Sequence, residues 1–145
     1  MSPTLPRQLV VLPLALLLGA CEEGGRASGE ALYARYCSSC HRPDGQGQRA
    51  VFPPLKGHAA ELAATPEGRR RLIQTPLLGR QGPLVVDGVG YDGLMVPLRS
   101  LRDEDLAAIL NHVLSSWGND RLLPPGHQPI KPYEVAQWRD QPPLP

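Results

Sequence analysis

The sequence predicts a single, mostly α-helical domain of short helices joined by long ordered loops, with one small β-hairpin. A length of 145 residues suits one domain with one modest core. The composition combines 17 Pro and 15 Gly with only 5% aromatic residues, which favours turns and loops over a large sheet. Residues 103–117 have a helical period, and residues 82–91 have the pattern of a hairpin.

The N-terminal residues have the layout of an export signal. Arg7 precedes an apolar stretch, Leu9 to Leu18, which ends in small residues just before Cys21. The stretch is too short to span a membrane, which takes about 20 apolar residues. The run Leu-Gly-Ala-Cys that ends at Cys21 resembles a bacterial lipoprotein lipobox, in which the cysteine is lipidated and becomes the N-terminus. Ordinary cleavage after Ala20 is the alternative, and we expect lipidation of Cys21.

The chemistry is concentrated in residues 37–41, which read Cys-Ser-Ser-Cys-His, the pattern of c-type haem attachment. Two thiols about one helical turn apart reach the two vinyl groups of one porphyrin, and the histidine presents its imidazole to the iron. The alternatives are a redox disulfide or half of a zinc site. The chain has no second C-x-x-C or H-x-x-H, and it lacks the strand and helix context of a thioredoxin. We therefore predict one covalent haem c on Cys37 and Cys40, with His41 as an axial ligand.

A six-coordinate haem needs a second axial ligand, for which the candidates are Met95, His58, His112 and His127. Met95 is the only methionine besides Met1, and its loop has no helical or strand period that would assign it to packing. Thioether ligation favours reduced iron and raises the potential, which suits an electron carrier. We predict Met95 as the ligand and surface or packing roles for the three histidines. The rival interpretation is a gas-binding or catalytic haem protein with an open distal site.

Residues 29–119 resemble a class I monohaem cytochrome c, most closely the type found as partners or subunits of bacterial dehydrogenases and oxidases. Gly29, Tyr33 and Cys37, at four-residue spacing, are similar to the family's N-terminal helix, whose glycine and aromatic residue pack against the C-terminal helix. The resemblance implies three to five helices around one covalent haem, with a small hairpin before the methionine loop. It also implies single-electron transfer and no catalysis of its own.

The segment Phe-Pro-Pro-Leu at residues 52–55 resembles the family's segment after the haem motif. There a proline carbonyl accepts the hydrogen bond of the axial histidine, and a leucine packs on the porphyrin. By position, Pro53 and Leu55 match these two roles. Such a bond fixes the imidazole tautomer and strengthens the ligand.

Two further elements follow from their own residues. Asp87-Gly88 is a two-residue turn signal inside the hairpin of residues 82–91. The predicted helix of residues 103–117 opens with three acidic residues, where the helix dipole favours negative charge, and Gly118-Asn119 ends it. Within it, His112 stands where the family commonly has tyrosine, so its contact with Tyr33 should be more polar than usual.

The remaining segments are less informative. Arg69 to Arg71 lie on a helix predicted for residues 66–75. Because consecutive residues point in different directions around a helix, we expect these arginines to form a solvated surface in preference to a docking patch.

Residues 120–145 contain seven prolines and should be extended or disordered. The exception is a short helix at residues 132–139, with Val135 and Trp138 docked on the domain.

These observations divide the chain into a signal peptide (1–20), a lipidated tether (21–28), a cytochrome c domain (29–119) and a proline-rich extension (120–145). With 15 Lys and Arg against 14 Asp and Glu, no basic field indicates a nucleic-acid partner. The expected partners are a redox donor and acceptor, such as a dehydrogenase, oxidase or reductase, and a membrane reached through the lipid. We expect a carrier or a complex subunit of a respiratory chain, exported to the periplasmic side of a bacterial membrane.

Overall fold

The computed structural model describes residues 26–144, so the predicted signal peptide and Cys21 lie outside the described residues. Six α-helices, one 3-10 turn and one hairpin follow in the order α1 (Gly29–Tyr36), α2 (Ser38–His41), α3 (His58–Ala63), α4 (Pro66–Leu78), β1 (Pro83–Val86), β2 (Val89–Asp92), α5 (Asp103–Ser115), η1 (Asn119–Arg121) and α6 (Pro132–Arg139). The mostly-α prediction is confirmed. The described part contains more than the expected three to five helices because the four-residue α2 and the C-terminal α6 add to them. None of these helices has the length and apolarity to cross a membrane.

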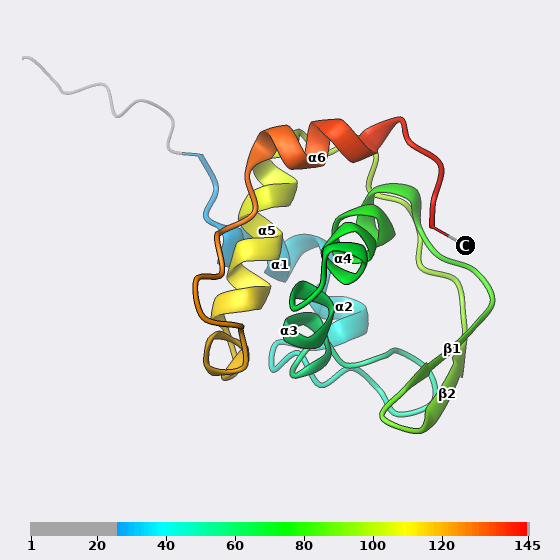
Figure 1. Cartoon of the computed structure of the whole chain (residues 1–145). Coiled ribbons are helices and arrows are strands. Elements are labelled where there is room, and N and C mark those ends of the chain that lie inside the picture. The colour runs from blue at the N-terminus through cyan, green and yellow to red at the C-terminus, as the bar shows by residue number, and fades with distance from the viewer. Residues whose placement is uncertain (1–25, 145) are drawn as a thin grey trace, which may run out of the picture.

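The first and last helices of the predicted domain, α1 and α5, pack against each other (Figure 1). A Cβ atom at Gly29 would lie 2.2 Å from the carbonyl oxygen of Ala108, so only glycine permits this close approach. One turn on, buried Tyr33 meets His112, with 5.5 Å between the ring centroids. The predicted packing of the glycine and the aromatic residue on the C-terminal helix is therefore confirmed.

The helices α3 and α4 form the second packed pair, and here the sequence-based boundaries are incomplete. We predicted no helix at α3, and α4 continues three residues beyond the predicted end at Thr75. Pro76 lacks a backbone N–H and removes one helical hydrogen bond. The last turn persists nevertheless, because Pro76 and Leu77 are buried and the N–H of Gly79 donates to the carbonyl oxygen of Thr75 at 2.9 Å.

The predicted hairpin is confirmed. Strands β1 and β2 are antiparallel, and their pairing runs from Pro83 opposite Asp92 to Val86 opposite Val89. The turn residues Asp87 and Gly88 have φ angles of 50° and 71°, as a type I′ turn requires. Figure 1 shows the hairpin projecting at the opposite side of the molecule from α1 and α5.

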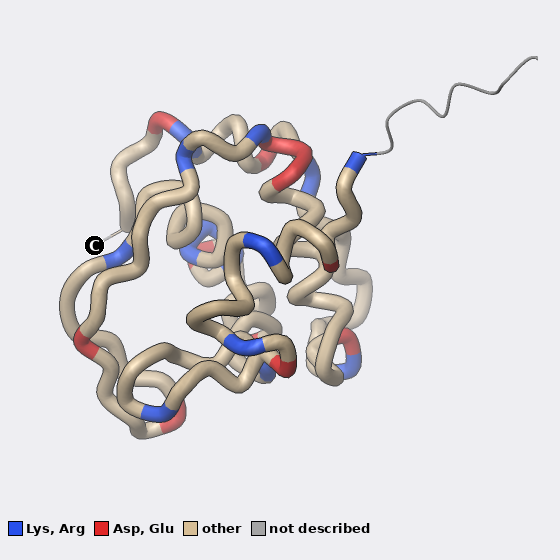
Figure 2. The backbone as a smooth tube through the Cα atoms, turned by 180° about the vertical axis from the view of Figure 1, so that it is seen from behind, with Lys and Arg blue, Asp and Glu red and all other residues tan. Residues whose placement is uncertain are grey.

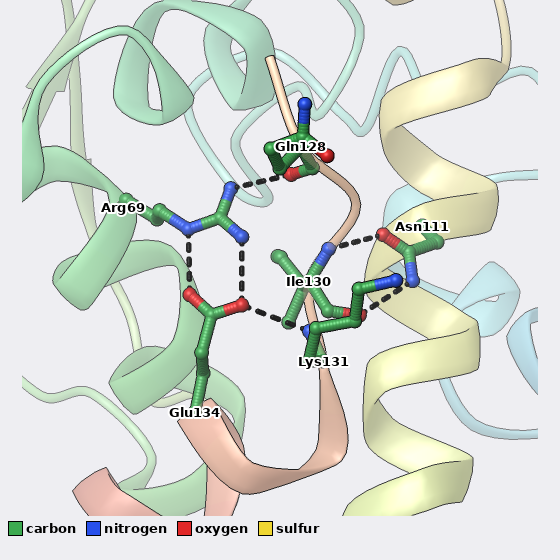
Figure 3. Close-up of polar contacts among 6 residues, drawn as sticks. All are labelled: Arg69, Asn111, Gln128, Ile130, Lys131 and Glu134. Carbon is green, nitrogen blue, oxygen red and sulfur yellow. Dashed lines mark hydrogen bonds and ion pairs between the residues drawn. The ribbon is translucent and has the colours of Figure 1, made fainter.

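The C-terminal extension packs back onto the domain through α6, which contacts α4 and α5. Val135 of α6 and Ile130, just before α6, are both fully buried. Figure 3 shows how the segment that precedes α6 is fastened. Asn111 of α5 donates to the carbonyl oxygen of Ile130 at 2.9 Å and accepts from its N–H at 2.8 Å. The predicted helix at residues 132–139 is confirmed, and the segment before it is irregular but held in place.

Two of the three clustered arginines also hold the extension. The guanidinium of Arg69 donates to both carboxylate oxygens of Glu134, at 2.8 and 2.9 Å (Figure 3). The guanidinium of Arg70 lies 4.5 Å from the ring centroid of Trp138 and donates to Gln74 at 3.0 Å. The expectation of a solvated arginine surface is therefore wrong for Arg69 and Arg70, because α6 covers them.

Candidate haem site

The attachment motif occupies the junction of two helices. Cys37 ends α1, where its N–H donates to the carbonyl oxygen of Tyr33 at 2.9 Å. It also starts α2, because its carbonyl oxygen accepts the N–H of His41 at 2.9 Å. This single turn places Cys37, Cys40 and His41 in one short helical segment. Neither cysteine is in a disulfide.

Cys37 is buried, and burial raises the pKa of its thiol to about 11, with the charge of Cys40 as a second cause. A redox-active cysteine in a C-x-x-C motif requires the opposite shift, because the reactive species is the thiolate. The surroundings of Cys37 thus disfavour the redox-disulfide alternative. They suit a sulfur that is consumed in a covalent bond.

His41 is oriented by a hydrogen bond across the loop that follows it. Its side chain is 7% exposed, and Nδ1 lies 2.9 Å from the carbonyl oxygen of Pro53. A carbonyl oxygen only accepts, so Nδ1 carries the proton and Nε2 keeps a free lone pair. Burial lowers the pKa of His41, while the bond to Pro53 opposes this shift. The result is a neutral, fixed imidazole of the kind that binds a metal.

Pro53 belongs to a loop of residues 42–57, which we call the proximal loop. Within it, Gln48 and Phe52 form an isolated bridge, and the N–H groups of Leu55 and Lys56 both donate to the carbonyl oxygen of Gly45, at 2.8 and 3.0 Å. Leu55 is half-buried and packs against the hydrophobic core. The predicted pair Pro53 and Leu55 therefore lies on a loop that is closed on itself by backbone hydrogen bonds.

Met95 is held by its backbone rather than by its side chain. Its N–H donates to the carbonyl oxygen of Arg80 at 2.8 Å, and its carbonyl oxygen accepts the N–H of Arg80 at 3.0 Å. These bonds tie residues 93–97, which we call the methionine loop, to the segment that follows α4. Its neighbours Leu94 and Val96 are 66% and 62% exposed. In an extended segment, alternate side chains point to opposite faces, so Met95 is directed away from these two neighbours.

The three histidines that competed for the distal position have other surroundings. His58 lies 3.5 Å from the carboxylate of Glu61 on α3. His112 packs against the rings of Tyr33 and Trp117, with centroid distances of 5.5 and 6.0 Å. His127 belongs to the extension, where burial and the charge of Arg69 lower its pKa. The structure brings none of the three into the segment of Cys37, Cys40, His41 and Pro53.

The residues present fit a haem in one further respect. The Nε atom of Arg80 is buried without a hydrogen-bond partner, although its guanidinium donates to the carbonyl oxygen of Pro83 at 2.9 Å. A buried guanidinium N–H next to the Met95 backbone suits a ligand that carries carboxylates, as haem does. Within residues 26–144, no three His, Cys, Asp or Glu side chains gather to hold a bare metal ion. A haem needs no such group, because the porphyrin supplies four nitrogen ligands.

Sequence reasoning missed three side chains that hold the proximal loop. The hydroxyl of Tyr33 donates to the carbonyl oxygen of Arg42 at 2.7 Å, and the indole N–H of Trp117 donates to Pro43 at 3.0 Å. Asn119 bonds to the far end of the loop, at Leu55 and Gly57. No local pattern identifies these contacts, because Trp117 and Asn119 lie more than sixty residues from their partners.

Basic and acidic residues are both scattered over the backbone in the view of Figure 2. Arginine and lysine residues neighbour aspartate and glutamate residues over most of that side of the molecule.

Comparison with known proteins identifies the family. The cytochrome c family model matches residues 27–117. Cytochrome c-552 of Thermus thermophilus is 41% identical over 124 residues, which cover 86% of this chain and 82% of that protein. The fructose dehydrogenase cytochrome subunit of Gluconobacter japonicus is 34% identical over 97 residues, which cover 63% of this chain and 19% of the subunit.

The alcohol dehydrogenase (quinone) cytochrome c subunit of Gluconacetobacter polyoxogenes is 30% identical over 94 residues, again 63% of this chain and 19% of the subunit. The chain thus spans about a fifth of each dehydrogenase subunit but most of the length of cytochrome c-552. The matched region includes the haem-attachment turn, the proximal loop and the methionine loop. The chain therefore belongs to the cytochrome c family: it is a class I monohaem cytochrome that carries one covalently bound haem c and transfers electrons.

Proposed function

We propose that this cytochrome holds its haem by thioether bonds at Cys37 and Cys40, with His41 and Met95 as axial ligands. The observation that carries the proposal is the His41 geometry. Nδ1 lies 2.9 Å from the Pro53 carbonyl oxygen, which leaves Nε2 available beside the two thiols of the same helical turn. The haem, when bound, takes up and releases one electron at a time.

The chain's own residues fix that cofactor in one state of ligation. Pro53 holds the imidazole in one tautomer and raises its basicity. Leu55, half-buried on the proximal loop beside the hydrophobic core, would supply an apolar contact to the porphyrin. Met95 fills the second axial position and so keeps small ligands from the iron, while its thioether favours the reduced state. Two hydrogen bonds between the backbones of Arg80 and Met95 hold Met95 in place.

The proposed setting is the periplasmic side of a bacterial membrane, reached by export and anchored through lipid on Cys21. A diacylglyceryl group together with an N-acyl chain would bind a membrane more firmly than the marginal hold of a single acyl chain. The redox partners proposed are a dehydrogenase on one side and an oxidase or reductase on the other. The similarity to cytochrome subunits of two dehydrogenases supports the first of these partners.

Replacement of the distal ligand tests the proposed ligation. In Met95→Ala holoprotein, the ferrous iron should bind carbon monoxide, the reduction potential should fall, and the covalent haem should remain. Leu94→Ala, which removes an exposed neighbour, is the control and should behave as wild type. If wild type binds carbon monoxide readily and Met95→Ala changes neither binding nor potential, the distal site is open and the gas-binding or catalytic interpretation replaces electron transfer.

The anchor is tested separately by mass spectrometry of the mature N-terminus. A terminus at Cys21 carrying a diacylglyceryl group and an acyl chain supports the proposal. An unmodified cysteine, or a terminus elsewhere, refutes the lipid anchor and leaves the haem ligation untouched. Membrane association of Cys21→Ala is a poorer readout, because that variant also disturbs signal cleavage.

A further inference from the structure

We propose that Asn119, just beyond the end of α5, is a positioning residue for the axial ligand His41. Its side chain fixes the end of the proximal loop, and that loop presents the Pro53 carbonyl oxygen to Nδ1 of His41. This inference rests on the proposed ligation by His41. It assigns to the C-terminal end of the domain a role in the chemistry of the N-terminal haem motif.

The side chain of Asn119 is fully buried, and its amide makes three hydrogen bonds. Nδ2 donates to the carbonyl oxygen of Val113 at 2.8 Å and to that of Leu55 at 3.2 Å, and Oδ1 accepts the N–H of Gly57 at 2.6 Å. Only the bond to Val113 serves the end of α5. The other two fasten the proximal loop, so helix capping alone does not account for this residue.

The proximal loop needs an anchor of this kind because Pro53 and Pro54 have no backbone N–H to donate. The hydrogen bonds on either side of the two prolines, from Phe52 to Gln48 and from Leu55 to Gly45, stay within the loop and do not tie it to the helices. The Leu55 carbonyl oxygen also accepts the N–H of Ala59 at the start of α3. Asn119 is the side chain that joins this end of the loop to α5.

The other end of the proximal loop is held from the same turn of chain. The Trp117 indole donates to the carbonyl oxygen of Pro43 at 3.0 Å, and its ring covers Gly45, where a Cβ atom would lie 2.3 Å from the ring. Trp117 and Gly118 have positive φ angles, 54° and 87°, which reverse the chain after α5. This reversal brings Trp117 and Asn119 to opposite ends of one loop, with Pro53 between them.

The chain supplies a matched control in Asn111, which lies on α5, eight residues before Asn119. Asn111 also makes a two-way amide contact with a backbone, but its partner is Ile130 in the extension (Figure 3). Asn111→Ala and Asn119→Ala therefore remove the same chemical group and similar hydrogen bonds. They differ in the segment that is released: the extension in one variant and the proximal loop in the other.

The experiment measures hydrogen exchange of the His41 Nδ1 proton by NMR in the ferrous holoprotein, which is diamagnetic when low-spin. In Asn119→Ala we expect this proton to exchange on the order of ten times faster, as the loss of a buried hydrogen-bond anchor predicts. Amide protons at the α1–α5 contact provide the reference for global unfolding. The reduction potential should rise, because a looser hydrogen bond makes the imidazole less basic and stabilises ferric iron less. In Asn111→Ala, both quantities should match wild type.

The inference is overturned if the His41 ring proton and the potential are unchanged in Asn119→Ala, or if Asn111→Ala changes them equally. If Asn119→Ala does not accumulate as holoprotein, the same measurements are made on Asn119→Ser, which keeps a small polar group. A holoprotein without histidine on the iron would instead contradict the proposed ligation. Intact His41 ligation with an unresponsive ring proton would contradict only the role of Asn119.

Discussion

The cytochrome domain and the C-terminal extension are held by different kinds of contact. The α1–α5 core is a set of buried apolar side chains, such as Leu32, Leu106 and Leu110. The described part of the extension has two buried apolar residues, with Leu123 and Trp138 partly buried against the core. It is fastened in addition by charged and amide groups, among them the pair of Arg69 and Glu134. Apolar burial does not depend on protonation, whereas an ion pair does. The docking of the extension should therefore respond to pH and salt separately from the haem domain.

The largest effect should come from the apolar core. Leu106 is fully buried on α5, and Leu106→Ala should reduce the free energy of unfolding by about 2–5 kcal/mol through lost burial and a cavity. Denaturant unfolding of the holoprotein measures this loss, with Leu122→Ala, at an exposed leucine, as the control. A loss below about 1 kcal/mol would contradict the contrast drawn between domain and extension, because the stability of the domain would then not depend on its apolar core.

The ion pair should have a smaller and more local effect. Glu134→Gln leaves the Arg69 guanidinium without its carboxylate and should cost about 2 kcal/mol, less than a fully buried pair because both side chains stay partly exposed. Hydrogen exchange at Ile130 and Val135 should accelerate while the potential stays constant. Glu104→Gln, at an exposed pair, is the control. A changed potential would show that the extension and the haem site are coupled.

The same carboxylate should make the docking of the extension pH-dependent. The hydrogen bond from Arg69 lowers the pKa of Glu134, and burial opposes this shift only in part. Its stabilising contribution is therefore complete above the unfolded pKa of about 4.3 and is lost as the pH falls through the lower folded pKa. The difference in stability between wild type and Glu134→Gln should shrink from pH 6 to pH 3. A difference that stays constant would exclude the carboxylate as its source.

The smallest effect should come from the exposed start of α5. Arg102 pairs with Asp105 at 2.8 Å and makes no capping hydrogen bond through its side chain. Its hydrogen bond lowers the pKa of Asp105, but the guanidinium is open to solvent and screened by salt. Thermal unfolding of Arg102→Ala at physiological ionic strength should give an unchanged Tm. A fall of several degrees in Tm would show that this surface pair contributes as much to stability as the partly buried pair of Arg69 and Glu134.

The sequence predicted best those features that local residues determine. The Asp87-Gly88 turn needs two positive φ angles, and the stripe of apolar residues on α5 is a local period, so the turn and the start of α5 appeared where expected. The predicted end of that helix at Trp117 is wrong: α5 ends at Ser115, because Trp117 and Gly118 have positive φ angles that reverse the chain. The sequence could not predict the partners of Arg69 and Asn119, because Glu134 lies 65 residues from Arg69 and Gly57 lies 62 residues from Asn119 along the chain. The end of α4 was misplaced for the same reason: the burial of Pro76, which a tertiary contact decides, outweighed its local preference.

The burial of Cys37 has a consequence for the order of events during maturation. The cysteine belongs to the buried core to which both α1 and α5 contribute, and these helices are separated by more than sixty residues of chain. Closing so long a loop is the slow, entropically costly part of assembly. While it is open, both thiols are accessible; once it closes, Cys37 is enclosed and its thiol is neutral. We therefore expect haem attachment to precede the docking of α5, so that the cofactor is enclosed by the same event that completes the fold.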